Sequence, residues 1–151
     1  MIFKIYMEGG GWACIDIEIE SKSFNYNINF HVGDTLTDLL EGITILCGAE
    51  NEYCFGIPYL DKSTFSWQVQ DDWRRVEFNF KKIEDKVNMQ ILNYDEEIHC
   101  VFDNLIDFND LLEEIIKSCT EILKINGFIG YLINSGSSCD FPIAYYLILK
   151  K

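Results

Sequence analysis

Three stretches at the start of the chain alternate apolar and polar side chains with the period of a β-strand. In Trp12–Glu20 three isoleucines alternate with acidic residues, and in Phe24–His31 aromatic and aliphatic residues alternate with asparagines. Ile2–Met7 alternates more weakly and is followed by a glycine turn at Gly9–Gly11. Because only a short polar turn separates the second stretch from the third, the pattern predicts an antiparallel hairpin.

The period changes after Gly33, where apolar residues recur every three or four positions. This spacing predicts a helix over Thr35–Cys47, with Asp34 as its N-cap and Gly48 as its stop. The next segment, Asn51–Lys62, alternates in part but contains glycine and proline. The pattern of that segment therefore fits either a strand or a loop.

A second series of alternating stretches predicts a meander of strands joined by short polar turns. These stretches are Phe65–Val69, Val76–Phe80, Val87–Ile91 and the shorter Ile98–Phe102. Trp67 falls on the apolar side of its stretch and is expected in the core. Trp12 and Trp73 stand at strand starts, where they either cover the ends of the core, which burial statistics favour, or stand exposed beside acids as interface anchors.

The strongest helical pattern is Phe108–Ile125, where apolar residues recur at helical spacing over four turns. Asp107 is the expected N-cap and Gly127 the expected stop. Phe128–Ile133 is then predicted as a short strand or extended segment, and a loop rich in glycine and serine follows over Asn134–Asp140.

The C-terminal segment Phe141–Lys151 fits two structures. Pro142 suits the first position of a helix, whereas the aromatic and β-branched residues that follow suit a strand nearly as well. Taken together, the elements predict one α+β domain over 1–151. We expect an antiparallel meander sheet of about six strands with two or three helices packed on one face.

Charge narrows the choice of partners, because the chain has 25 acidic and 12 basic residues and a net charge of −13. Such a charge repels phosphate backbones and anionic lipid, so neither nucleic acid nor membrane is an expected partner. The charge is also segregated: Val87–Ile116 holds eight acids and no lysine or arginine, while five basic residues cluster between Arg74 and Lys86.

Catalytic and metal-binding chemistry finds little support in the pattern of residues. The six cysteines form no C-x-x-C pair, and His31 and His99 stand at no ligand spacing. His99 and Cys100 are neighbours on a predicted strand, so their side chains face opposite sides. Met1–Met7 lacks the apolar core of a signal peptide, which favours the cytoplasm and free thiols. We therefore expect no enzyme, no metal and no cofactor.

Three segments carry a loose resemblance to known proteins: Val32–Leu40 after a polar strand, Phe65-x-Trp67 at the start of the meander, and Gly127–Tyr131 followed by Phe141-Pro142. In this order they resemble small acidic bacterial proteins of unknown function, some of which are similar to immunity proteins of toxin–immunity systems. The resemblance implies a secreted toxin encoded nearby as the partner. It transfers no site residue.

These observations favour a cytosolic protein-binding protein, an immunity protein that neutralises a basic, nuclease-like toxin domain through an acidic surface. The binding residues predicted from the density of acids are Asp95, Glu96, Glu97, Asp107, Asp110, Glu113 and Glu114. We expect a monomer or a weak dimer. The alternative is a small ligand-binding module or an enzyme of unknown reaction, which a pocket lined by convergent polar groups would favour.

Overall fold

The computed structural model describes residues 1–29, 35–48, 62–136 and 140–151. Within these residues, one antiparallel sheet has seven strands in the order β1-β2-β3-β4-β5-β6-β7, and three helices accompany it. The strands are β1 Ile2–Gly9, β2 Trp12–Ile19, β3 Lys22–Asn29, β4 Thr64–Asp71, β5 Arg74–Ile83, β6 Lys86–Tyr94 and β7 Ile98–Asp107. The helices are α1 Thr35–Leu46, α2 Phe108–Asn134 and α3 Ile143–Leu149. The predicted α+β class with an antiparallel meander is confirmed.

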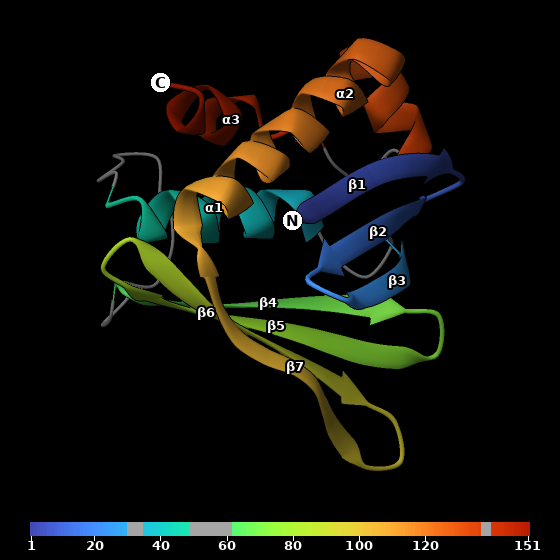
Figure 1. Cartoon of the computed structure of the whole chain (residues 1–151). Coiled ribbons are helices and arrows are strands. Elements are labelled where there is room, and N and C mark those ends of the chain that lie inside the picture. The colour runs from blue at the N-terminus through green and yellow to red at the C-terminus, as the bar shows by residue number, and fades with distance from the viewer. Residues whose placement is uncertain (30–34, 49–61, 137–139) are drawn as a thin grey trace.

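The sheet bends sharply between β3 and β4, so that β1–β3 turn away from the broad β4–β7 layer (Figure 1). Among the described residues, Ile28 and Asp71 are the one pair across this junction. The Asp71 carboxylate compensates by accepting a hydrogen bond from the Asn27 backbone N–H at 2.8 Å and another from Arg74 Nε at 2.8 Å. A side chain therefore takes the place of ladder hydrogen bonds where the two parts of the sheet meet.

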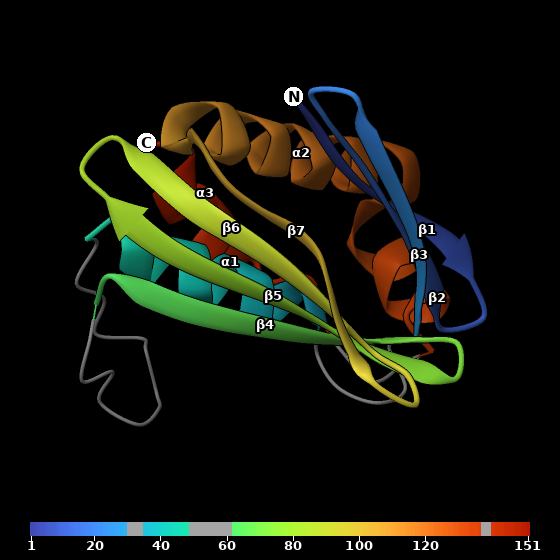
Figure 2. The same ribbon diagram turned by 60° about the horizontal axis from the view of Figure 1, so that its bottom comes forward.

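The three helices lie on one side of the β4–β7 strands, as Figure 2 shows. Helix α1 packs against β4, and α2 runs along β1. The core between them is aromatic: the Trp67 ring lies 5.0 Å from Phe78 and 6.4 Å from Phe3, and its indole N–H donates to the Thr35 carbonyl at 2.8 Å. Trp67 thus contacts both parts of the sheet and the start of α1, as its place in the alternation predicts.

Helix α2 begins where the sequence places its cap. The Asp107 carboxylate accepts hydrogen bonds from the backbone N–H groups of Asn109 and Asp110. Gly127 breaks the helix with φ 63° and ψ −178°, as its predicted role as a stop requires. The chain then resumes a helix to Asn134, so the predicted strand Phe128–Ile133 is wrong.

The contacts of Phe128–Ile133, and not its strand propensity, accompany its helical form. No described strand pairs with this segment, and only Tyr131 in it is fully buried. Tyr131 packs edge-on against Phe141 at 5.4 Å, and its carbonyl accepts from the Ser135 N–H in a helical turn. Local aromatic and β-branched content favours a strand, but the helical turn buries Tyr131 and brings the Asn134 carbonyl to the Gly11 N–H.

The C-terminal segment, which the sequence allowed to be a helix or a strand, forms the helix α3. Pro142 is the N-cap of this helix and not its first helical residue, as was predicted. The strand predicted over Ile98–Phe102 is longer and runs directly into α2. The predictions for Asn51–Lys62, apart from Lys62 itself, and for His31 and Asp34 lie outside the described residues.

Candidate functional site

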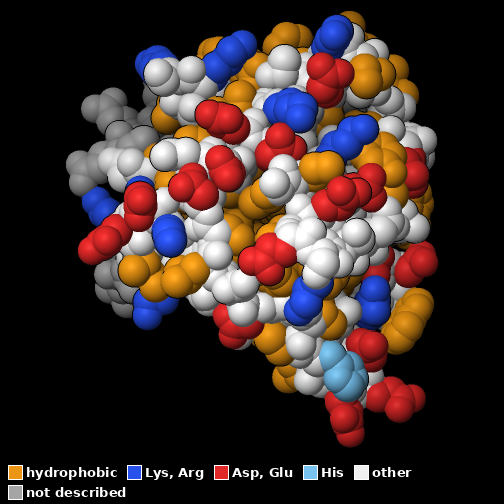
Figure 3. Space-filling view, viewed as in Figure 1, with side chains coloured by type: hydrophobic (Ala, Val, Ile, Leu, Met, Phe, Trp, Pro, Cys, Tyr) orange, Lys and Arg blue, Asp and Glu red, His pale blue; other side chains and the backbone are white. Residues whose placement is uncertain are grey.

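The acidic residues Asp95, Glu96 and Glu97 form the turn between β6 and β7. All three are exposed, and the turn is closed by a hydrogen bond from the Asp95 N–H to the Glu97 carbonyl at 3.2 Å. Their carboxylates extend from the end of the hairpin, and Figure 3 shows acidic side chains at this lowest point of the molecule. The turn therefore presents a concentrated negative charge to solvent.

The structure does not bring these residues together with the second predicted group, Asp107, Asp110, Glu113 and Glu114. That group stands at the opposite end of β7, which at the usual rise of a strand is about 30 Å away. A standard interface of about 800 Å² per partner is only about 30 Å across. One partner of ordinary size cannot centre on both groups.

Two members of the second group also serve the fold. Asp107 caps α2 through two backbone hydrogen bonds. Glu114 accepts from the Phe3 N–H at 3.3 Å and pairs with Lys117 at 3.1 Å, and its side chain is only 18% exposed. Asp110 and Glu113 remain exposed on the first turns of α2. This group is therefore a weaker candidate for a binding surface than the β6–β7 turn.

Trp73 is the residue that the sequence interpretation misplaced. It was expected to cover an end of the core, but 74% of it is exposed. It occupies the two-residue turn between β4 and β5, beyond the last pair Asp71–Arg74, where Asp72 has a positive φ of 49°. The turn therefore holds the indole away from the sheet. Trp12, the other tryptophan expected to cover an end of the core, is half-buried.

The turns β4–β5 and β6–β7 lie at the same end of the sheet, because Arg75 near the start of β5 pairs with Tyr94 at the end of β6 (Figure 1). Ile98, at the start of β7, is 63% exposed beside the acidic turn. We define the tip surface as Asp72, Trp73, Asp95, Glu96, Glu97 and Ile98. It combines an exposed aromatic residue and an exposed aliphatic residue with four acids.

Two arginines near the tip surface moderate its charge. Arg74 is bound to the Asp71 carboxylate, and the Arg75 guanidinium lies 4.1 Å from the centre of the Tyr94 ring. Arg74 is therefore neutralised, whereas Arg75 leaves one positive charge among four negative ones. The net field at this end of the sheet remains negative.

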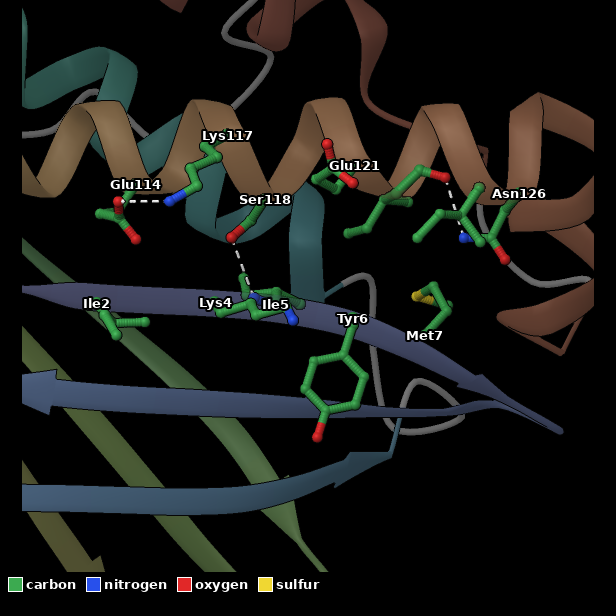
Figure 4. A pocket seen from close by; sticks show the side chains of 12 residues that line it. Ile2, Lys4, Ile5, Tyr6, Met7, Glu114, Lys117, Ser118, Glu121 and Asn126 are labelled. Atoms are coloured by element: carbon green, nitrogen blue, oxygen red, sulfur yellow. Dashed lines mark hydrogen bonds and ion pairs between the residues drawn. The ribbon is translucent and has the colours of Figure 1, made fainter.

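A groove of about 580 Å³ follows the edge strand β1 along α2. Figure 4 shows side chains from α2 above and from β1 below it. Ser118 Oγ accepts from the Ile5 N–H at 3.1 Å and donates to the Phe3 carbonyl at 3.0 Å. Together with Glu114, Ser118 occupies backbone groups that an added strand would use. This half of the β1 edge is thus closed by the helix.

Three of the described cysteines, Cys14, Cys47 and Cys119, have a raised pKa, for which burial is the largest cause. Burial raises the pKa of the Cys119 thiol to about 12, and burial is also the largest cause of the raised pKa of Cys14. Cys14 hydrogen-bonds to the Asn27 side chain, and its neighbour Tyr6 has a raised pKa chiefly because of its hydrogen bond to Cys14. A thiol that stays protonated at neutral pH is a weak nucleophile. His99 and Cys100 are both exposed at the start of β7.

Within the described ranges, no three His, Cys, Asp or Glu residues gather as a metal site. None of the described helices combines the length and the apolar character needed to span a bilayer. No protein-family model, curated protein or solved structure matches this chain.

Proposed function

We propose that this chain is a protein-binding protein that holds a basic partner against its tip surface. The observation that carries the proposal is the composition of that surface, in which Trp73 and Ile98 are strongly exposed beside four acids. Exposed aromatic residues supply much of the binding energy of protein interfaces, and a surrounding acidic rim favours a basic partner.

We further propose that the partner is a toxin domain of the nuclease type and that the chain is its immunity protein. Nucleases that bind phosphate backbones carry basic surfaces, and an acidic protein associates with them rapidly. The net charge of −13 and the resemblance noted in the sequence support this part of the proposal.

The experiment compares three immobilised baits in an extract of the source cells. The first is the native chain, and the second is the tip variant Asp95→Lys, Glu96→Lys, Glu97→Lys. The third is a control variant, Glu18→Lys, Glu84→Lys, Asp110→Lys, with the same net charge. Three exchanges of two charge units each change −13 to −7 in both variants. All six positions are exposed, so folding should be preserved.

We expect a basic protein to be retained by the native chain and by the control, and lost from the tip variant. A protein retained equally by all three baits contradicts the tip surface as the binding site. If the retained protein cleaves nucleic acid and the native chain inhibits the cleavage, the immunity proposal is supported. If it cleaves nothing, the chain binds a basic protein but does not neutralise a nuclease.

The groove along β1 favours a second candidate, a small-ligand module. Its volume lies within the range of about 300–1,000 Å³ that small-molecule sites have, and its lining is mostly apolar. A compound that raises the melting temperature of the native chain, but not that of Met7→Trp with the groove filled, would support this function. A compound that stabilises both equally binds elsewhere.

A further inference from the structure

Four large apolar residues are exposed together around the break in α2. Ile125, Phe128, Ile129 and Ile133 are each between 57% and 75% exposed. We call these four residues the α2 end patch. Figure 3 shows hydrophobic side chains gathered over this far end of the helix. Exposed single residues are common, but a group of this size usually marks an interaction site.

The segment that carries the patch is held firmly to the fold. The Asn134 side chain donates to Asn126 Oδ1 at 2.8 Å, and the Asn134 carbonyl accepts from the Gly11 N–H at 2.8 Å. Tyr131 is fully buried on the inner side. The patch is therefore the outer face of a well-anchored helical turn, and a frayed chain end does not explain its exposure.

The charge around the patch differs from that of the rest of the chain. Between Ile122 and Gly136 there is no acidic residue, and the only charged residue is Lys124, which pairs with Glu121 at 3.9 Å. Two copies of a chain with a net charge of −13 repel each other over most of their surfaces. They meet less of this repulsion at the patch, where α2 carries no acid after Glu121.

The size of the patch fits an interface between two copies. With about two thirds of each residue exposed, it presents on the order of 400 Å² of apolar surface. A homodimer interface of standard size needs about 500 Å² of apolar surface from each partner, roughly two thirds of about 800 Å². We propose that the α2 end patch is the contact of a symmetric dimer, with a second copy of this chain as its occupant. The tip surface stays free in such a dimer.

Sedimentation velocity of the full chain, from about 1 µM to about 300 µM, tests the proposal. We expect the mass to rise from 17.6 kDa towards twice that value. Ile129→Glu should raise the dissociation constant of the dimer by at least about 30-fold, because it places a charge in the apolar contact. The matched control Ile98→Glu makes the same exchange on the tip surface, at a position 63% exposed against 75% for Ile129, and should leave the dimer unchanged.

Three results would overturn the proposal: a native chain that stays monomeric at every concentration, a dimer that survives Ile129→Glu, or a dimer that Ile98→Glu disrupts equally. Flotation with phosphatidylcholine vesicles identifies a lipid occupant if the monomeric chain binds them through Ile129. Loss of the basic partner from the Ile129→Glu bait would assign the patch to that partner instead. A folded circular dichroism spectrum for both variants excludes unfolding as the cause.

Discussion

Gly42, in the middle of α1, is a position where one added methyl group should destabilise the fold. A Cβ atom built there would lie 2.2–2.3 Å from three carbons of the Phe65 ring. The ring cannot easily move aside, because Phe65 is buried and stacks on Phe80 with 5.8 Å between centroids and 8° between planes. Gly42→Ala must therefore displace the helix or break the stack.

The magnitude follows from two opposing contributions. Overpacking of a tight core costs about 1–3 kcal/mol, and a contact this short lies at the upper end of that range. Alanine is the better helix former by about 1 kcal/mol. We expect Gly42→Ala to lower the free energy of unfolding by about 2 kcal/mol.

Gly130→Ala is the matched control, because Gly130 is also a helical glycine. Its added Cβ would meet the Asn126 Cβ at 3.3 Å, a contact that a small shift relieves. We expect this variant to be as stable as the native chain or slightly more stable. Urea denaturation followed by tryptophan fluorescence measures both variants, at a low protein concentration so that self-association does not contribute.

A double-mutant cycle locates the cause at the ring. Phe65→Leu removes the atoms that the new methyl group would meet, so the double variant Gly42→Ala, Phe65→Leu should be more stable than the two single effects predict, by about 1–2 kcal/mol. If Gly42→Ala is as stable as Gly130→Ala, or if the two changes are simply additive, the packing of α1 on β4 described above is wrong.

Three further outcomes are expected. Asp71→Ala should lower the free energy of unfolding by about 2–3 kcal/mol in urea denaturation, because the Asn27 N–H and the Arg74 guanidinium lose their acceptor; a loss below about 0.5 kcal/mol would contradict this role. Burial, and after it the neighbouring Asp38, raise the pKa of Glu41 in the folded chain. Glu41 therefore contributes to the stability of the fold at low pH, and this contribution is lost as the pH rises through the raised pKa. Calorimetry should therefore find Glu41→Gln more stable than the native chain at pH 7 and equal to it near pH 4; a constant difference would contradict this. N-ethylmaleimide should label Cys100 rapidly in the folded chain and leave Cys119 unlabelled, and all six thiols should react after denaturation; equal labelling of the two, or fewer than six thiols, would refute this.

Local patterns in the sequence predicted most of the fold. Alternation identified the strands, helical spacing identified α1 and the first part of α2, and Asp107 was recognised as a cap because an acid preceded a helical pattern. These features depend on neighbours along the chain. The segment after Gly127 could not be predicted in the same way, because its helical turn is held by contacts distant in sequence, such as the hydrogen bond from the Gly11 N–H to the Asn134 carbonyl.

The candidate site was less accessible from sequence, since it depends on distances between elements. The density of acids identified Asp95–Glu97, but the length of β7 separates them from Asp107 and Asp110. Trp73 joins the acidic turn only because β4–β5 and β6–β7 end at the same side of the sheet. The exposed turn dipeptide Asp72-Trp73 was the signal that could have indicated an exposed indole.

The rate of association with the retained basic partner, measured by stopped flow between about 20 mM and about 300 mM salt, tests the binding surface most directly. The native chain and the charge-matched control Glu18→Lys, Glu84→Lys, Asp110→Lys should associate rapidly at low salt and at least about tenfold more slowly at high salt. The tip variant Asp95→Lys, Glu96→Lys, Glu97→Lys should associate slowly at low salt and respond little to salt. If the tip variant and the control behave alike at every salt concentration, the tip surface is not where the partner binds.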